Sequence, residues 1–322
     1  MPRELKWRLV LAFAALYVIW GSTYLAIRIA VETMPPFSMA AVRFLVAGAV
    51  LYAWARRRGA APPTRAQWRS AAIIGTLLLL VGNGGLVWAE TRVASGLAAL
   101  IVGAEPLVVV ALDWIRPGGR RPSLGAGIGL AIGFVGLMLL IAPSDTAGAA
   151  VDGLGAAVLM LAIVGWAIGS IYSRHADTPG APLMATGANM LAGAVALTLA
   201  AGLNGEFAAL DVGAISLRST LALAYLTLFG AIVGFTAYIW LLRNTTLAKA
   251  STYAYVNPIV AVFLGWLILD EVITLRTMLA AVVIVGGVVM ISVLPLLGNH
   301  RKVRGIITDF TNLPVFRTGS GR

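Results

Sequence analysis

Ten apolar stretches, each long enough to cross a lipid bilayer as a helix, dominate this sequence. A spanning helix needs roughly 20 mainly apolar residues. The stretches lie at residues 9–31, 37–55, 70–89, 94–115, 123–142, 153–173, 182–203, 219–242, 246–268 and 274–297. Because they are continuous runs and do not alternate between apolar and polar residues, they exclude a transmembrane β-barrel. The predicted fold class is an all-α membrane protein with ten transmembrane helices.

The composition of the 322 residues agrees with this prediction, since 60% are apolar and only 11% are charged. A soluble domain is typically about 45–50% apolar and about 25% charged. The chain has no cysteine and only two histidines, which excludes disulfides and thiolate ligands and makes a histidine metal site unexpected. We therefore predict no metal and no cofactor.

The basic residues give the predicted orientation. If the stretches alternate in direction, roughly four in five of the 24 lysines and arginines fall on the side that holds both termini. Cytoplasmic segments carry this excess, so both termini are predicted to lie in the cytoplasm, with the chain in the inner (plasma) membrane. The net charge of +11 is dispersed among the inter-helix segments, so we expect no nucleic-acid partner. The predicted partners are a small-molecule substrate and the lipid bilayer.

The two halves of the sequence resemble each other. A shift of 152 residues aligns identical residues in the pairs Trp88–Trp240, Pro106–Pro258, Trp114–Trp266 and Gly82–Gly234. A repeat of five helices makes the second copy enter the membrane from the opposite side, which inverts it relative to the first. Inverted repeats are typical of secondary transporters, whose substrate site lies near the bilayer midplane between the repeats.

This repeat predicts the organisation of the chain. The segments are a cytoplasmic N-terminus (1–8), a first five-helix repeat (9–142), a linker (143–152), a second five-helix repeat (153–297) and a basic cytoplasmic tail (298–322). Gly129 and Gly133 have the spacing that lets helices approach closely. That spacing fits a dimer seam or internal packing, of which we favour packing, and it leaves open whether the protein is a monomer or a homodimer.

Several motifs occur in the same order as in a known family. They are Trp20-Gly21-Ser22-Thr23-Tyr24, Pro35-Pro36 with Arg43-Phe44, Glu105-Pro106-Leu107 through Asp113-Trp114, Asn257-Pro258-Ile259 after Ala250-Ser251, and Gly265-Trp266-x-x-Leu269-Asp270-Glu271. With these motifs the chain resembles the drug/metabolite transporter superfamily, specifically the ten-helix EamA-type exporters, over about residues 8–297. The resemblance implies a metabolite exporter whose fifth and tenth helices lie away from the cavity. The first half departs from the pattern. The second half has an acidic turn, Asp270-Glu271, and the first half has Arg116-Pro117-Gly118-Gly119 at the equivalent place.

Glu105 is the main candidate for a functional residue, because it lies near the middle of the fourth stretch beside Pro106. A charged group at the bilayer centre costs at least about 2.5–3.5 kcal/mol, so such residues usually face a cavity or a partner. We predict that Glu105 couples transport to protons or balances a cationic substrate. The alternative is a protonated carboxyl that bonds a backbone carbonyl freed by Pro106. Asn257 occupies the equivalent position of the second half and is expected to line the same cavity.

Other polar and aromatic residues within the stretches are also predicted to line the substrate cavity. They are Trp20, Ser22, Tyr24, Asn83, Trp88, Trp166, Ser170 and Tyr238. Bonding to their own helix is the alternative for the serines, and anchoring at the membrane interface is the alternative for Trp88.

Two prolines and one arginine complete the candidates. Pro106 and Pro258 are predicted to kink their helices and to serve gating, with a fixed packing kink as the alternative. Arg43 is predicted to attract an anionic group or to pair with Glu32 or Glu90.

These features predict a secondary active transporter that exports small organic metabolites, such as amino acids or amphipathic compounds, by alternating access. No ATP-binding motif occurs, so a gradient must drive the flux. The alternatives are a passive facilitator or channel, a membrane-embedded enzyme and a scaffold. We predict no enzyme, because the stretches contain no paired carboxylates, histidine cluster or serine–base pair.

Overall fold

The computed structural model describes residues 3–115, 122–141, 152–173, 175–244 and 253–297, and they form an all-helical bundle. The first half contains α1 (Arg3–Ala30), α2 (Pro36–Arg57), α3 (Arg65–Gly75), η1 (Thr76–Gly84), α4 (Gly85–Ala89), α5 (Ser95–Val102), α6 (Glu105–Ile115) and α7 (Leu124–Ile141). The second half contains α8 (Gly153–Ser173), α9 (Pro182–Leu203), α10 (Glu206–Ala209), η2 (Val212–Ala214), α11 (Leu217–Tyr225), η3 (Leu226–Val233), α12 (Gly234–Asn244), α14 (Tyr253–Leu269) and α15 (Leu275–Leu297).

The apolar stretches form the helices that the sequence predicts. Among the described residues, eight helices are long and apolar enough to cross a membrane, and α14 and α15 contain shorter apolar helices. The all-α membrane fold is therefore confirmed. The part of the ninth predicted stretch before Tyr253 lies outside the described residues, as do residues 116–121 and 298–322.

Local sequence explains where several helices begin. Pro36 and Pro182 stand in the first turns of α2 and α9, where the missing N–H of proline costs no hydrogen bond. At the start of α3, Thr64 and Gln67 form a reciprocal capping box, in which each side chain accepts a hydrogen bond from the other residue's backbone amide.

The third and eighth predicted helices are more complex than the sequence suggested. Each is a run of three segments whose central one is π-helical: α3, η1 and α4 in the first half, and α11, η3 and α12 in the second. A π-helical segment widens the helix and frees backbone carbonyls for other partners, and such segments are frequent at functional sites. Hydropathy patterns do not distinguish this widening from a regular helix.

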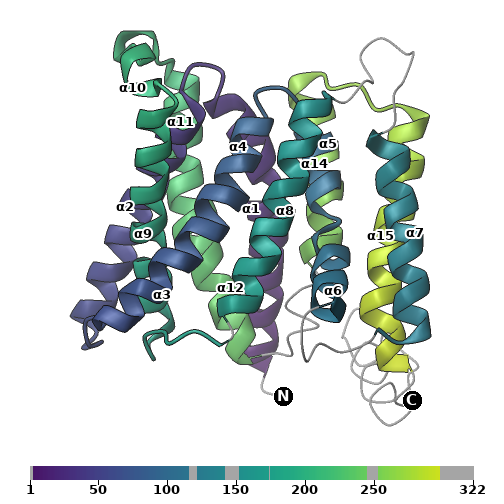
Figure 1. Cartoon of the computed structure of the whole chain (residues 1–322), viewed down its shortest axis with the longest axis horizontal. Helices are drawn as coiled ribbons and strands as arrows, with labels where there is room; N and C mark the ends of the chain where they lie inside the picture. Colours follow the sequence, from purple (N-terminus) through teal and green to yellow (C-terminus); the bar gives the residue numbers. More distant parts are fainter. Residues whose placement is uncertain (1–2, 116–121, 142–151, 174, 245–252, 298–322) are drawn as a thin grey trace, which may run out of the picture.

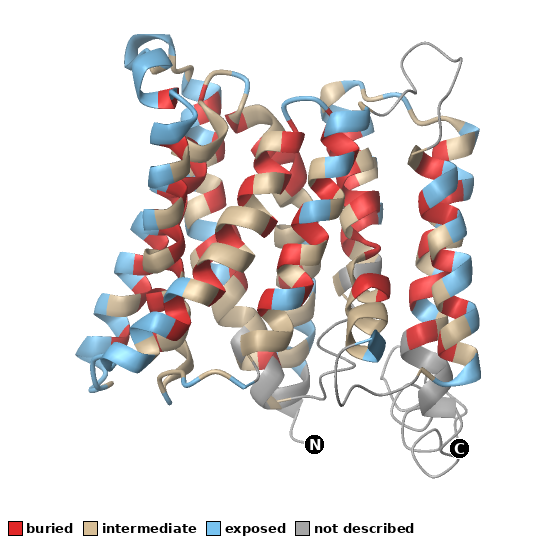
Figure 2. Ribbon diagram, in the orientation of Figure 1, coloured by how far each residue is buried: buried red, intermediate tan, exposed pale blue. Residues whose placement is uncertain are grey.

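The helices lie side by side, with α1, α5, α8 and α14 near the centre (Figure 1). The first turn of α1 and the last turn of α15 lie at one end of the bundle, at the bottom of Figure 1. The opposite end carries α10 and the starts of α2 and α5, and we call it the upper end. Buried residues face the interior, whereas exposed ones, many of them large and apolar, face outward (Figure 2). Outward apolar side chains suit contact with lipid.

Helix α7 pairs with α15 at one edge of the bundle (Figure 1). A Cβ atom on Gly287 would lie 2.6 Å from both the Gly129 carbonyl oxygen and the Gly133 backbone nitrogen. Only glycines allow the two backbones to approach so closely. The Gly129–Gly133 stripe therefore packs inside the chain.

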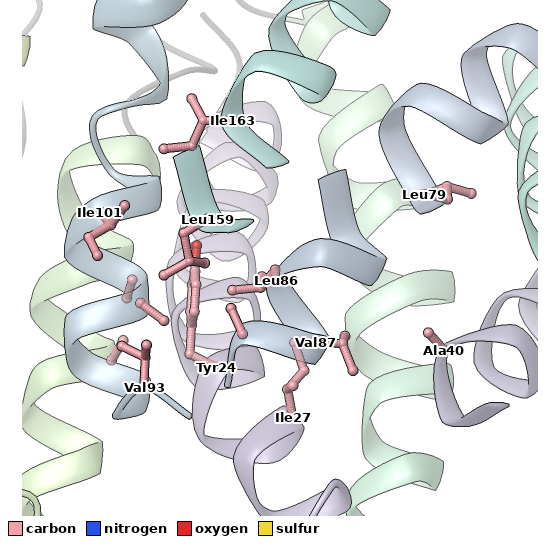
Figure 3. Close-up of a cluster of buried hydrophobic side chains, with 14 of the residues drawn as sticks. Tyr24, Ile27, Ala40, Leu79, Leu86, Val87, Val93, Ile101, Leu159 and Ile163 are labelled. Carbon is pink, nitrogen blue, oxygen red and sulfur yellow. The ribbon is translucent and has the colours of Figure 1, made fainter. Parts of the chain in front are cut away.

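The centre of the bundle is an apolar cluster that joins helices of both halves. Figure 3 shows Tyr24 of α1 among Leu86 of α4 and Leu159 and Ile163 of α8. Leu159 and Ile163 are almost fully buried. This cluster lies directly beside the cavity described next.

Candidate functional site

A cavity of about 120 Å³ lies within the bundle and is lined by residues from both halves of the sequence. Helices α1, α2, η1, α4, α5 and α6 contribute Trp20, Thr23, Tyr24, Ile27, Arg43, Phe44, Leu79, Gly82, Asn83, Leu86, Val102 and Glu105. Helices α8, η3, α12 and α14 contribute Ala162, Ile163, Trp166, Gly230, Phe235, Tyr253 and Asn257. The wall is mainly apolar and aromatic, with a few polar groups, which is the usual character of a site for a small organic molecule.

Seven of the residues singled out in the sequence lie together in this wall. They are Trp20, Tyr24, Arg43, Asn83, Glu105, Trp166 and Asn257. Glu105 and Asn257 both line this cavity, as their equivalent positions in the two halves predict. Phe235 also lines the cavity, and the sequence did not single it out. Tyr253 lines it too, in agreement with the expectation that at most one of Tyr253 and Tyr255 shares the cavity side with Asn257.

Several polar atoms in the cavity wall are buried and lack a hydrogen-bond partner among the described residues. They are Nε and Nη1 of Arg43 and the side-chain oxygens of Asn83 and Asn257. Arg43 is only 4% exposed, and its guanidinium lies over the ring of Phe44 at 4.9 Å from the ring centroid. Buried polar groups are nearly always paired, so these atoms are available to a bound molecule. Arg43 offers donors, and the two asparagines offer acceptors.

An aromatic cluster around Trp20 forms one side of the cavity. The ring centroid of Trp20 lies 5.4 Å from that of Phe235, 5.3 Å from that of Tyr238 and 4.9 Å from that of Tyr253. The indole Nε1 donates a hydrogen bond of 3.2 Å to the carbonyl oxygen of Gly230 in the π-helical segment η3. Tyr238 therefore packs against Trp20 and Tyr253 of the cavity wall and is not itself among the lining residues.

The backbone breaks immediately before Glu105. Helix α5 ends at Val102, and Glu105 is the first residue of α6, so Gly103 and Ala104 interrupt the predicted helix. Pro106 stands in the first turn of α6, where it is well tolerated. The irregularity expected at Pro106 thus lies on its N-terminal side, as a two-residue turn within the span Ser95–Ile115.

Pro258 differs from Pro106, because it lies inside the continuous helix α14. Its ring packs against the break, since a Cβ atom on Gly103 would lie 2.8 Å from Cγ of Pro258. The two prolines that the repeat relates are thus gathered near one point beside Glu105. Their role in gating stays a prediction.

Three other predicted residues lie outside the lining. The hydroxyl of Ser22 lies 2.6 Å from that of Tyr225 and also donates to backbone carbonyls of its own helix. Trp88 lies next to the end of α4, with the Arg92 guanidinium 4.9 Å from its ring centroid. Ser170 lies near the end of α8.

Two carboxylates at the upper end were not among the predicted site residues, and each caps a helix from the other half. Glu271 accepts hydrogen bonds from the backbone amides of Ser95 and Gly96 and from the Ser95 hydroxyl. Glu206 accepts hydrogen bonds from the amides of Phe37 and Ser38 and from the Ser38 hydroxyl. Carboxylates are stabilised at helix N-termini by the free N–H groups and the helix dipole. These contacts join the two halves at one end of the bundle.

The geometry of the acidic turn explains the motif that ends with it. Asp270 has φ 54°, which turns the chain sharply after α14, and the Glu271 amide donates to the Gly265 carbonyl at 3.1 Å. A Cβ atom on Gly265 would overlap Oε2 of Glu271. Gly265, Asp270 and Glu271 therefore act together to place the carboxylate at α5.

The structure also shows where Glu32 and Glu90, the two predicted pairing partners of Arg43, lie. Glu32 lies 3.7 Å from Arg218 in an exposed ion pair. Glu90 is fully buried after α4, and the Arg28 guanidinium donates a hydrogen bond to its backbone carbonyl. The charge of Arg43 faces that of Glu90, although no salt bridge joins them among the described residues.

Comparison with known proteins shows which family the chain is similar to. The sequence profile of the EamA-like transporter family matches residues 7–142 and 153–293. The chain is 41% identical over 283 residues to the "Uncharacterized inner membrane transporter YedA" of Escherichia coli (strain K12), covering 87% of this chain and 89% of that one. It is 28% identical over 282 residues to the "WAT1-related protein At3g02690, chloroplastic" of Arabidopsis thaliana, covering 86% and 67%.

One solved structure has a similar fold, with a TM-score of 0.61 and 20% sequence identity over 89% of this chain and 98% of the other. The family profile matches well over half of the residues, and the relative from Escherichia coli is similar over nearly its whole length. The resemblance inferred from the motifs is thereby confirmed. The chain belongs to the EamA-like transporter family.

Proposed function

We propose that this protein is a secondary active transporter that exports small organic metabolites, such as amino acids or amphipathic compounds, through the cavity between its two halves. The observation that carries the proposal is the set of unpartnered polar atoms in an otherwise aromatic and apolar wall. Arg43 suits a carboxylate, and Asn83, Glu105 and Asn257 suit an ammonium group. The rings of Trp20, Phe235 and Tyr253 suit an apolar side chain.

The arrangement of the helices supports alternating access between two inverted five-helix repeats. The two π-helical segments of the described chain, η1 and η3, fall at nearly the same place in the repeat, because the 152-residue shift aligns Gly82 with Gly234. The cavity draws its wall from both halves. A pseudo-symmetric pair of halves offers two similar arrangements, each open to one side of the membrane.

The charge distribution supports an orientation with both termini in the cytoplasm, because the segments on that side carry most of the lysines and arginines. The name of the YedA relative supports a place in the inner membrane. In that orientation the capped starts of α2 and α5 face away from the cytoplasm (Figure 1).

The proposal is tested by reconstituting the full chain in liposomes and measuring the flux of radiolabelled amino acids, sugars and organic cations. A secondary active transporter accumulates one of these solutes against its gradient when a pH gradient is imposed. A passive facilitator brings the solute only to equal concentrations on both sides. No flux of any solute in either condition overturns the proposal.

Variants of the cavity make the assay specific. Asn257→Ala removes an unpartnered buried oxygen from the wall and is expected to weaken transport. Glu32→Gln is a matched control, since Glu32 lies in a partly exposed pair with Arg218 outside the cavity lining. Equal flux in the two variants would contradict the assignment of the cavity.

A further inference from the structure

Glu90 is the most unusual carboxyl group in the described part of the chain. It is 0% exposed, and neither of its carboxylate oxygens has a hydrogen-bond partner among the described residues. By contrast, the carboxylates of Glu206 and Glu271 each accept three hydrogen bonds at helix N-termini. Burying a carboxylate charge without donors is costly, and Glu90 is not among the residues that line the cavity.

The surroundings of Glu90 connect it to the cavity. Four charged or titratable groups face it: Tyr24 and Arg28 from α1, Arg43 from α2, and Glu271 from the turn after α14. Arg28 is engaged with the backbone carbonyl of Glu90. Arg43 lines the cavity and keeps two unpartnered nitrogens. The positive charge of Arg43 therefore acts both on the buried carboxyl group of Glu90 and on any anion that enters the cavity.

Glu271 has the same charge as Glu90 and disfavours its ionisation. Glu271 is held by Ser95 and Gly96 and is not among the residues that line the cavity. Arg43 is the neighbour whose charge a substrate can neutralise.

We propose that Glu90 is a proton-binding residue of the transport cycle, which takes up a proton from solvent when an anionic group of the substrate binds Arg43 and releases it when that group leaves. This inference rests on the proposed function, because it requires an anionic group to reach the cavity. Arg28 and Arg43 both favour ionised Glu90. Neutralising Arg43 removes one of these two charges, and the incoming anion adds repulsion. Proton binding and substrate binding thus favour each other, as linkage requires.

The consequence is a defined pH dependence. If one proton is taken up with each substrate anion, binding becomes tighter as the pH falls through the range in which Glu90 titrates. The dissociation constant then changes by at most about tenfold per pH unit. Glu90→Gln removes the proton site, so binding in that variant is expected to lose this dependence.

The proposal is tested by infrared difference spectroscopy of the full-length protein in lipid nanodiscs across a pH titration. The stretching band of protonated carboxyl groups is assigned to Glu90 by its loss in Glu90→Gln. In Arg43→Gln the Glu90 band should persist to higher pH than in the unmodified protein, because one of the two favourable positive charges is gone and only that of Arg28 remains. Glu32→Gln is the control for an exposed carboxyl and should leave the Glu90 band unchanged.

The second arm adds probe molecules at a pH where Glu90 is ionised. L-phenylalanine suits the aromatic wall and carries a carboxylate, whereas its amide lacks one. L-phenylalanine should restore the Glu90 band, whereas its amide should not. L-threonine and benzoate are the alternative carboxylate probes. The same probe is also added to Glu90→Gln, and the spectrum of that sample is subtracted. This subtraction removes any band that comes from the probe itself.

Two results overturn the inference. One is a Glu90 band that does not move in Arg43→Gln, and the other is a band that no carboxylate restores although Arg43→Gln moves it. The liposome assay remains separate, since absence of flux there overturns the transporter whatever the Glu90 band does.

Discussion

Glu271 and Ser95 lie 176 residues apart and are joined by two hydrogen bonds, 2.7 Å from the Ser95 amide and 2.8 Å from its hydroxyl to the same carboxylate oxygen. The other oxygen accepts from the Gly96 amide at 3.0 Å. An acidic residue of the second half thus satisfies the exposed N–H groups at the start of α5 in the first half. Glu206 makes the same kind of contact with Ser38 at the start of α2.

Substitution Glu271→Gln should weaken this connection between the halves. The amide keeps one acceptor oxygen and puts an NH2 donor in place of the other, so at least one of the three bonds is lost and the rest become neutral. We expect a loss of about 1–3 kcal/mol of stability. Thermal unfolding of the purified protein in detergent measures the change. Glu32→Gln alters an exposed pair worth about 0–1 kcal/mol and is the matched control. An equal shift in both variants would show that the Glu271 contact contributes little.

Substitution Gly265→Ala should displace the Glu271 carboxylate without changing any charge. The new Cβ atom would also lie 3.0 Å from the Ser95 hydroxyl oxygen. We expect about 1–3 kcal/mol of destabilisation from the crowding. Gly286→Ala is the control, because nothing lies within 4 Å of its Cβ position. In the double variant Gly265→Ala with Glu271→Gln the two effects should sum to less than their separate values, since they act on one contact.

Substitution Gly287→Val should separate α15 from α7. Backbone atoms of Gly129 and Gly133 occupy the space that the new side chain needs. The expected result is a lower unfolding temperature and faster proteolysis of the detergent-solubilised protein. Gly127 lies on the same helix as Gly129 but has nothing within 4 Å of its Cβ position, so Gly127→Val serves as the comparison. A larger effect at Gly127 would contradict the packing described for this pair.

Substitution Glu105→Gln removes the ionisable group from the cavity wall and keeps its size. If Glu105 couples transport to protons, flux in liposomes should lose its response to an imposed pH gradient while equilibrium exchange of substrate continues. Glu90→Gln measured in the same assay separates the two carboxyl groups. A Glu105→Gln protein with unchanged gradient-driven accumulation would remove Glu105 from the coupling mechanism.

Hydropathy predicted the membrane helices well, and their interior irregularities poorly. The bounds of α2, α7, α8 and α9 agree closely with the predicted stretches. A kink at Pro106 was predicted, but the interruption of the helix at Gly103 and Ala104 was not, because both residues are apolar or small and fit a continuous hydrophobic run. The π-helical segments η1 and η3 were not predicted either, because a π-helical segment has the same apolar composition as a regular helix.

The candidate site was predicted in part. Trp20, Arg43, Glu105 and Asn257 could be singled out because polar and aromatic residues are conspicuous within apolar stretches. Phe235 carries no such signal, because the phenylalanine side chain has no polar group and does not stand out from its apolar neighbours. Glu90 was recognised only as a possible partner of Arg43, since its position at a helix end did not reveal that it is fully buried.

The sequence by itself determined that this chain is an all-helical membrane protein, where its helices lie and which transporter family it resembles. These properties depend on local composition and on motifs that are read along the chain. Only the tertiary structure decided that Arg43 and Asn257 share one cavity, that Glu271 caps α5 and that Glu90 is buried without a hydrogen-bond partner among the described residues. The reason is physical: burial and pairing depend on side chains that approach from distant segments, and neither is a property of any single stretch.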